Sequence, residues 1–468
     1  MPEPDPLPAV GGADVGALMR SPRKQLHHTT HAGLLVRPSR LPASHARIDG
    51  IVVPTARPAS HLSDAMRLAS DHGCPILVLC SRDSNAIAAV AQAAEFGANA
   101  VAADVTGEEQ IGTLSRFATS RLLRGTDFDS GNDLSFKRNL GLALARMAGW
   151  ERILFLDDDM HDIESNAVSA AASLLDGFEV VGLRNNGFPD NSVLCHAYKG
   201  IDDNQDTFIG GGALAVATDR IRGFFPNVYN EDWLFMLASV AERRVAVWGE
   251  ARQLTYDPFA LPRRAQIEEF GDCLAEGLYH LLDTDGTIEG ADAAFWGEFI
   301  ADRRRLIDDT IDAIGKQSPP DDRRARALSA LDTSRRSNML LAPSDFVDYL
   351  SHWRKDGELW QAWIERLGSF DGIEKALAEV GLAATVPTPR AIAPSAVTKY
   401  APTAVQGRPV ANGAERRRWL ALWWRPFSTS RPPGRRTRST RAARWRPGFM
   451  VNSFSRRLAR HASNTLTN

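Results

Sequence analysis

The chain has 468 residues, 44% of them hydrophobic and 24% charged, which is the composition of an ordinary globular protein. No stretch approaches the ~20 consecutive apolar residues of a membrane-spanning helix, and the N-terminus lacks the basic and apolar regions of a signal peptide. The four cysteines are scattered, without the paired spacing of a zinc site or a disulfide framework. We therefore expect a cytoplasmic protein of two or three domains, or of one large domain with extensions.

The net charge of −2 conceals two oppositely charged parts. Residues 416–468 contain fourteen arginines and no Lys, Asp or Glu, which leaves residues 1–415 at −16. The acidic charge of this larger part argues against its binding nucleic acid. The arginines and tryptophans of the tail are typical of a helix at a membrane surface, and peripheral membrane contact is one hypothesis. A solvated arm, a nucleic-acid-binding arm and a shifted reading frame remain open as alternatives.

Residues 1–47 are rich in Pro, Ala, His and Arg without periodicity, and they are predicted to be a disordered lead-in. Strands are predicted at 48–53, 75–80 and 98–105, and an alanine-rich helix at 87–96. Strands that alternate with helices indicate βαβ units, and hence an α/β fold with a mainly parallel sheet.

The next elements follow a loop at 125–133 that is dense in turn-forming residues. We expect a helix that ends at Gly149, then a buried strand at 153–156. Another strand is predicted at 208–216, interrupted by three glycines, and a further helix begins near Asn230.

The C-terminal half is predicted to be mostly helical. Segments with helical periodicity lie at 265–282, 291–313, 325–331, 343–367 and 372–380. The sequence thus divides into a lead-in (1–47), an α/β domain (48–261), a helical region (262–381), a Pro- and Ala-rich linker (382–415) and the basic tail (416–468).

Asp157, Asp158 and Asp159 directly follow the buried strand at 153–156. Three adjacent negative charges at the rim of a core are costly unless something positive lies beside them. In an open α/β sheet, ligands bind at the carboxyl ends of the strands. For the tripeptide alone, an acidic turn explains the pattern equally well.

Several further motifs occur in a fixed order around this triplet. They are Pro54–Pro58 after the first strand, Lys137–Gly141 at a helix start, Gly210–Gly212, and Asn230–Trp233. In order and spacing, the set resembles the GT-A-fold glycosyltransferases, in particular the family 2-like enzymes, over about residues 48–260. The resemblance implies a Rossmann-like sheet with flanking helices. It also implies transfer of a sugar, of the hexosyl type, from a nucleotide-diphosphate sugar to a hydroxyl of a lipid-linked or saccharide acceptor.

The resemblance also implies a Mn²⁺ or Mg²⁺ cofactor. A hard divalent cation held by carboxylates neutralises the charge that develops on a leaving nucleoside diphosphate. By the family pattern, Asp159 is the direct metal ligand, and Asp157 is its partner nearer the ribose and sugar. Asp158 is expected to point into the scaffold.

Glu231 and Asp232 match the family's acidic pair at the start of a helix. In an inverting enzyme such a carboxylate deprotonates the acceptor hydroxyl, and we favour Asp232 over Glu231 for this role. In a retaining enzyme the pair would instead bind hydroxyl groups. An ordinary helix-capping pair is the plain alternative.

The expected donor-binding residues follow the first two strands, where the family holds the base and ribose: Thr55, Arg57, Ser81 and Asp83. The second strand ends in Cys-Ser-Arg-Asp-Ser at 80–84, whereas the family commonly has Asp-Asp-Gly-Ser, so the base stays open.

Lys137 and Arg138 are predicted to bind the diphosphate, and Gly211 to let the backbone approach the donor. His161, His196 and His280 are candidates for an additional metal ligand, although a lone histidine is more often structural.

Two other functions compete with sugar transfer. Sugar-nucleotide nucleotidyltransferases have a related sheet, but they carry a glycine-rich loop after the first strand, and Pro54–Pro58 contains no glycine. A non-catalytic protein that binds a partner through the basic tail is the other alternative.

Overall fold

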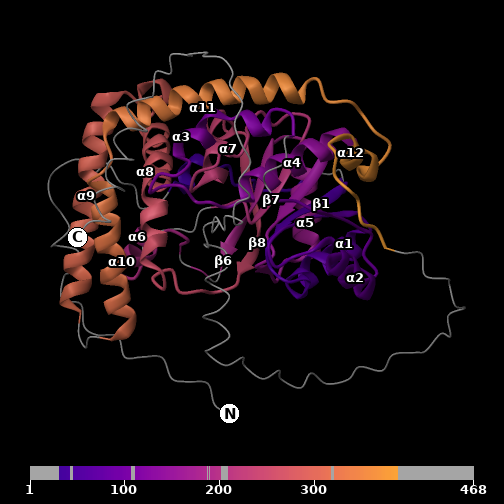
Figure 1. The fold of residues 1–468 in the computed structure, drawn as a ribbon, viewed down its shortest axis with the longest axis horizontal. Helices are drawn as coiled ribbons and strands as arrows, with labels where there is room; N and C mark the ends of the chain where they lie inside the picture. The colour runs from indigo at the N-terminus through magenta and orange to yellow at the C-terminus, as the bar shows by residue number, and fades with distance from the viewer. Residues whose placement is uncertain are drawn as a thin grey trace, which may run out of the picture.

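The computed structural model describes residues 31–42, 46–106, 111–186, 188, 190–201, 209–317 and 321–387. An eight-stranded sheet lies at the centre, in the order β3-β2-β1-β4-β7-β6-β8-β5. Helices flank the sheet, and long C-terminal helices stand beside it and cross above it (Figure 1). The predicted α/β fold with a helical C-terminal region is confirmed.

One half of the sheet is parallel and carries four of the five predicted strands. It consists of β1 (Gly50–Thr55), β2 (Ile76–Cys80), β3 (Ala100–Asp104) and β4 (Arg152–Leu156). In the other half, β7 (Ala213–Ala217) runs antiparallel to both β4 and β6 (Val180–Asn186). The strand β8 (Val245–Gln253) is parallel to β6, and the short β5 (Met160–His161) pairs antiparallel with β8. The sheet is therefore mixed.

The central strands are buried on both faces because two separate hydrophobic clusters cover them. One cluster packs α1 (Ser63–His72), α2 (Ala86–Phe96) and α5 (Ser165–Leu174) on one face. The other packs α4 (Leu134–Met147), α7 (Glu231–Ala241) and α12 (Ile373–Glu379) on the opposite face. Gly141 permits close packing of α4, since a Cβ there would lie 2.5 Å from Val52. Double coverage explains the continuous apolar runs of these strands.

The helical region consists of α8 (Pro262–Asp283), α9 (Ala293–Lys316), α10 (Asp322–Asn338) and α11 (Pro343–Ile364). Its helix α10 is longer than the predicted segment at 325–331. The region shares the core on the α4 face. Asp356 of α11 is buried and accepts hydrogen bonds from the backbone N–H groups of Ala118 and Thr119, both at 2.8 Å, where α3 (Ala118–Leu123) begins. The short α6 (Val193–Lys199) packs against α8 and α10.

Ordered structure extends into the predicted lead-in and linker. Residues 32–34 form a short 3₁₀ helix, and the backbone of Val36 pairs with that of Val245 and Val247 in β8, at 2.9 and 3.0 Å. Thr385 pairs with Ala102 of β3. Residues 1–30 and 388–468, which include the basic tail, lie outside the described residues. Within the described ranges, no helix combines the length and apolar character needed to cross a membrane.

Candidate functional site

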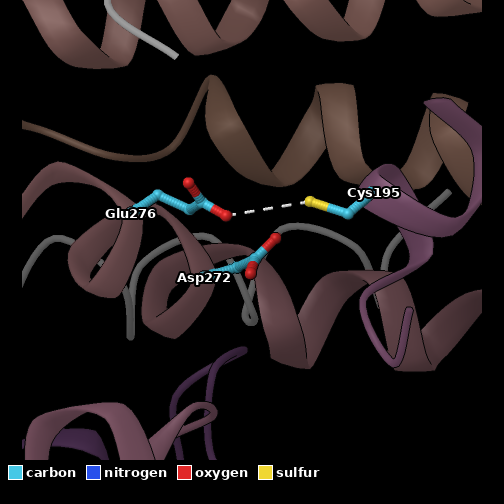
Figure 2. Close-up of side chains that lie close together, drawn as sticks. All are labelled: Cys195, Asp272 and Glu276. Carbon is cyan, nitrogen blue, oxygen red and sulfur yellow. Dashed lines mark hydrogen bonds between the residues drawn. The ribbon is translucent and has the colours of Figure 1, made fainter. Parts of the chain in front are cut away.

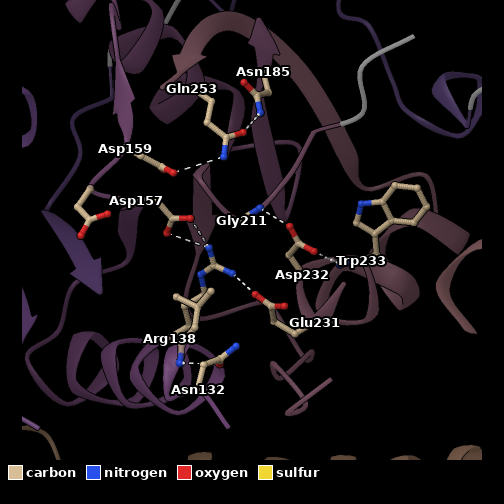
Figure 3. Close-up of polar contacts among 12 residues, drawn as sticks. Asn132, Arg138, Asp157, Asp159, Asn185, Gly211, Glu231, Asp232, Trp233 and Gln253 are labelled. Atoms are coloured by element: carbon tan, nitrogen blue, oxygen red, sulfur yellow. Dashed lines mark hydrogen bonds and ion pairs between the residues drawn. The ribbon is translucent and has the colours of Figure 1, made fainter. Parts of the chain in front are cut away.

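The predicted site residues gather where β1, β2 and β4 end, at one edge of the sheet. These strands are neighbours, so the loops that follow Thr55, Cys80 and Leu156 meet there. Side chains from α4, from the start of α7 and from the end of β8 reach the same place (Figure 3).

Arg138 of α4 lies between two of the predicted carboxylates. Its Nη2 donates to both oxygens of Asp157, at 2.8 and 2.9 Å, and its Nη1 donates to Glu231. The guanidinium is buried and lies 5.5 Å from the centre of the Phe225 ring. A Cβ on Gly211 would lie 2.5 Å from this guanidinium, so glycine at 211 leaves the room that Arg138 occupies.

One guanidinium cannot neutralise the three carboxylates around it. Burial raises the pKa of Asp157 to about 6, although Arg138 acts in the opposite direction. Burial likewise raises the pKa of Glu231 to about 8, with Arg138 opposing and the charge of Asp232 adding to the rise. If all three carboxylates were ionised, the site would therefore carry more negative charge than Arg138 balances.

Asp158 serves the scaffold, in agreement with its expected orientation. Its side chain is fully buried and accepts hydrogen bonds from Thr55 Oγ1 at 2.6 Å and from Arg57 Nη1 at 2.5 Å. Both of its oxygens are thus used to hold the loop after β1.

Among the three aspartates of the triplet, Asp159 has the weakest hydrogen-bond partners. Only weak contacts reach its Oδ2, from Arg57 Nη2 at 3.3 Å and from Gln253 Nε2 at 3.4 Å. Among the described residues, no hydrogen-bond donor reaches its Oδ1. Gln253 in turn accepts a hydrogen bond from Asn185 Nδ2 at 2.7 Å. Asp159 can therefore accept a metal ion without giving up a strong partner, whereas Asp157 first has to loosen its bonds to Arg138.

Lys137 joins the ends of β1 and β2. Its Nζ donates to the carbonyl of Thr55 at 2.8 Å and to Ser81 Oγ at 2.6 Å, and it lies 3.2 Å from Asp133. Burial lowers the pKa of Lys137, and Asp133 opposes the shift. Three acceptors use all three N–H groups of the ammonium. To bind a diphosphate as predicted, Lys137 would therefore have to exchange one of these three acceptors for a phosphate oxygen.

A small pocket adjoins this lysine, between the loop after β1 and the start of α4. Its lining is Pro54, Thr55, Ala56, Arg82, Asn132, Asp133, Leu134 and Lys137. Arg82 has a left-handed backbone (φ 56°) and its Nη2 donates to the carbonyl of Gly131 at 3.0 Å. Asp83, predicted to bind the donor, is exposed, and its N–H donates to the carbonyl of Ala56 at 3.3 Å.

The acidic pair occupies the start of α7, as expected from the sequence. Asp232 Oδ2 accepts from the N–H of Gly211 at 2.6 Å, and its Oδ1 accepts from the N–H of Trp233 at 2.9 Å. Gly211 therefore holds Asp232 through its backbone, besides making room for Arg138. Asp232 is fixed by backbone donors, whereas Glu231 is held by a side chain that can move.

Two of the three candidate histidines lie on other helices, and the third contacts a neighbouring aspartate outside the triplet. His161 belongs to β5 and pairs with Asp162 at 3.1 Å. His196 lies on α6 beside Arg323, and His280 lies on α8 near Phe295. No described contact joins any of them to Asp157 or Asp159. In their place the structure brings Gln253 and Asn185 to Asp159, two residues that were not predicted from the sequence.

A second acidic cluster is buried between α6 and α8 (Figure 2). Ligand atoms of Cys195, Asp272 and Glu276 lie within 4.8 Å of one another, a spacing that can hold a metal ion. However, Asp272 accepts from Arg303 Nη2 at 2.6 Å, and Glu276 pairs with His31 Nε2 at 3.0 Å. Burial also holds the pKa of the Cys195 thiol well above its usual value. A metal would have to displace these cations and the thiol proton.

No protein-family model matches the chain, and no curated protein sequence matches it significantly. Among solved structures, it is similar to mouse xyloside xylosyltransferase 1 in its apo form, with a TM-score of 0.23 and 12% sequence identity. The match covers 42% of this chain and 77% of that chain. A TM-score of this size does not indicate a shared function.

Proposed function

We propose that the protein is a metal-dependent glycosyltransferase that moves a sugar from a nucleoside-diphosphate sugar to an acceptor hydroxyl. The supporting observation is the surplus of acid at the edge of the sheet. Five carboxylates (Asp157, Asp158, Asp159, Glu231 and Asp232) share two guanidiniums, those of Arg57 and Arg138. Such a surplus is costly in a partly buried site unless a cation compensates it.

The residues at the edge fit a hard divalent cation. Carboxylate oxygens are the ligands that Mn²⁺ and Mg²⁺ prefer, and Asp159 offers an oxygen without a strong partner. Asp157 lies two residues away and completes the carboxylate pair once Arg138 releases one of its oxygens. The bound ion would supply positive charge to the leaving diphosphate.

Arg138 and its carboxylates suit recognition of hydroxyl groups. A sugar hydroxyl is both a donor and an acceptor, so it can bridge the guanidinium of Arg138 and an oxygen of Asp157 or Glu231. We assign the donor sugar to this position, and the nucleoside to the pocket beside Lys137 and Thr55. In this arrangement the sugar lies between the metal-binding carboxylates and the acidic pair of α7.

We assign proton transfer to Glu231 in an inverting reaction. A general base works best when its pKa lies near the working pH, and the pKa of Glu231 is raised to about 8. Asp232, favoured from the sequence alone, has both oxygens bound by backbone N–H groups. A retaining reaction needs no such base, and in that case Glu231 and Asp232 hold hydroxyl groups of the donor or acceptor.

Donor binding tests the proposal. Purified protein with Mn²⁺ is titrated with UDP-, GDP- and dTDP-sugars, and hydrolysis of each donor is recorded. We expect one donor to bind, and we expect Asp159→Asn or a chelator to weaken its binding. The matched control is Asp371→Asn, because the Asp371 side chain is 97% exposed and pairs with Lys375 on the surface. Donor binding that is unchanged by both Asp159→Asn and a chelator would contradict the proposal. Release of pyrophosphate from a nucleoside triphosphate and a sugar phosphate would instead favour nucleotidyl transfer.

Membrane contact through residues 416–468 remains a separate hypothesis, since the tail lies outside the described residues. Truncation after Ala414 followed by sedimentation with anionic liposomes tests it. Sedimentation that depends on the tail would support a lipid-linked acceptor, and unchanged sedimentation would remove the membrane hypothesis.

A further inference from the structure

We propose that Gln253 is an oxygen ligand of the divalent cation, and that Asn185 orients its amide. This inference rests on the proposed function and assigns to β8 a part in the metal site. The amide group of Gln253 is the neutral polar group that contacts Asp159 directly, and Asn185 contacts that amide from β6 (Figure 3).

The spacing of the two side chains suits a shared ion. Gln253 Nε2 lies 3.4 Å from Asp159 Oδ2, which is long for a hydrogen bond to a carboxylate. Two adjacent oxygen ligands of an octahedral ion with bonds of about 2.1 Å lie about 3.0 Å apart. The separation of the amide from Asp159 Oδ2 is therefore within a few tenths of an ångström of that between two adjacent ligands of one ion.

The backbone holds this spacing. Gln253 is paired with Met160, the residue that follows Asp159, in the β5–β8 ladder. The N–H of Leu254 also donates to the carbonyl of Asp159 at 2.9 Å. The two side chains therefore leave segments that are tied together on both sides, although they are far apart in the sequence.

The amide can present either atom to Asp159. Without an ion, the N–H group faces the carboxylate because it donates a hydrogen bond. Rotation of the amide by about 180° exchanges nitrogen and oxygen with little movement of the other atoms. The oxygen then faces the ion, and the Nε2 of Gln253 faces Asn185.

Asn185 supports both orientations of that amide. It now donates from Nδ2 to Gln253 Oε1 at 2.7 Å, while no described residue provides a hydrogen-bond partner for its own buried Oδ1. The same rotation of Asn185 turns Oδ1 toward Gln253 Nε2, where it accepts a hydrogen bond. Asn185 is thus a positioning residue, and Gln253 is the ligand. A neutral ligand also adds no negative charge to a site that already has a surplus.

The number of water molecules on bound Mn²⁺ tests the assignment. Mn²⁺ is titrated into the full-length protein, alone and with UDP, GDP or dTDP, and its coordinated water is measured by water-proton relaxation. We expect Gln253→Leu to weaken Mn²⁺ binding roughly tenfold and to add one coordinated water. Gln253→Asn, whose amide is too short to reach, should add the same water. Asn185→Leu should weaken binding less, without a consistent gain of water.

The control is Gln92→Leu on α2. This variant removes a comparable side-chain amide, which donates to Ser63 Oγ of α1 at 3.3 Å. Weaker binding by Gln253→Leu and Gln253→Asn with an unchanged water number would overturn the assignment, because Gln253 would then act only through Asp159. If Asp159→Asn weakens Mn²⁺ binding and both Gln253 variants bind normally, the ligand assignment fails and the proposed function stands. If wild type and Asp159→Asn bind Mn²⁺ equally, the proposed metal site itself fails.

Discussion

Replacing His31 with glutamine is expected to make the stability of the protein less dependent on pH. His31 lies in a buried position, between Glu276 and Asp283 of α8. Its ring contacts the edges of Trp233 and Tyr279, with 5.5 Å between the centres of the rings in each case. The imidazole therefore ties the N-terminal segment to α8 and to the first turn of α7, beside the candidate active site.

The size of the effect follows from the pKa of His31. Burial alone lowers this pKa, but hydrogen bonds and charges from Asp283 and Glu276 outweigh burial and raise it from 6.5 to about 9. A rise of this size corresponds to about 3 kcal/mol of stability. Because the pKa is higher in the folded state, the contribution is complete below pH 6.5 and is lost as the pH rises through 9.

The assay is urea unfolding at pH 6 and pH 9.5, followed by tryptophan fluorescence. We expect His31→Gln to lower the free energy of unfolding at pH 6, and the gap to wild type to shrink by up to about 3 kcal/mol at pH 9.5. His352→Gln, on α11 and outside this network, serves as the control. An equal gap at both pH values would refute the reasoning, since it would mean that folding does not shift the pKa of His31.

Three further variants probe the site and its support. If Glu231 is the base, the rate of sugar transfer rises with pH through about 8. Glu231→Gln should lower this rate by about 10²–10⁴-fold and remove its rise with pH. A normal rate in this variant would exclude Glu231 as the base. Gly211→Ala places a Cβ 2.5 Å from Arg138. We therefore expect the free energy of unfolding, measured by thermal unfolding, to fall by about 1–3 kcal/mol, and donor binding to weaken. Asp356→Ala leaves the N–H and hydroxyl of the buried Thr119 without their acceptor, so it should cost about 1–3 kcal/mol while donor binding by the folded protein persists.

The edge of the sheet could be predicted from the sequence because its signals are local. Each central strand is a continuous apolar run that ends at polar residues. The strand ends at Cys80 and Leu156 coincide with the predicted ends, and the end at Thr55 lies two residues beyond the predicted one. The alternation of these apolar strands with helical segments predicted the parallel half of the sheet. That half brings the loops after β1, β2 and β4 together.

The partners of the site residues could not be predicted in the same way. Lys137 and Arg138 were assigned to phosphate as cations, but their actual partners come from other segments of the chain. Gln253 is the last residue of β8 and Asn185 the last but one of β6, and neither strand was predicted. The strand β8 is only partly buried and includes Trp248, so it lacks the apolar run that marks the central strands. A neutral amide in such a strand carries no signal until the register is known.

Two acidic clusters compete for a metal in this fold, and the partners of their carboxylates distinguish them. In the cluster of α8, Asp272 shares Arg303 with Glu269, and Glu276 shares His31 with Asp283, so both carboxylates already have a cation partner. Asp272 also accepts from Asn230 Nδ2 at 2.9 Å and so supports the turn that starts α7. At the edge of the sheet, Asp159 has only long contacts among the described residues, from Arg57 at 3.3 Å and from Gln253 at 3.4 Å. Because a metal binds most readily where a carboxylate oxygen lacks a strong partner, we propose that the cation binds at Asp159 and that the cluster of α8 supports the start of α7.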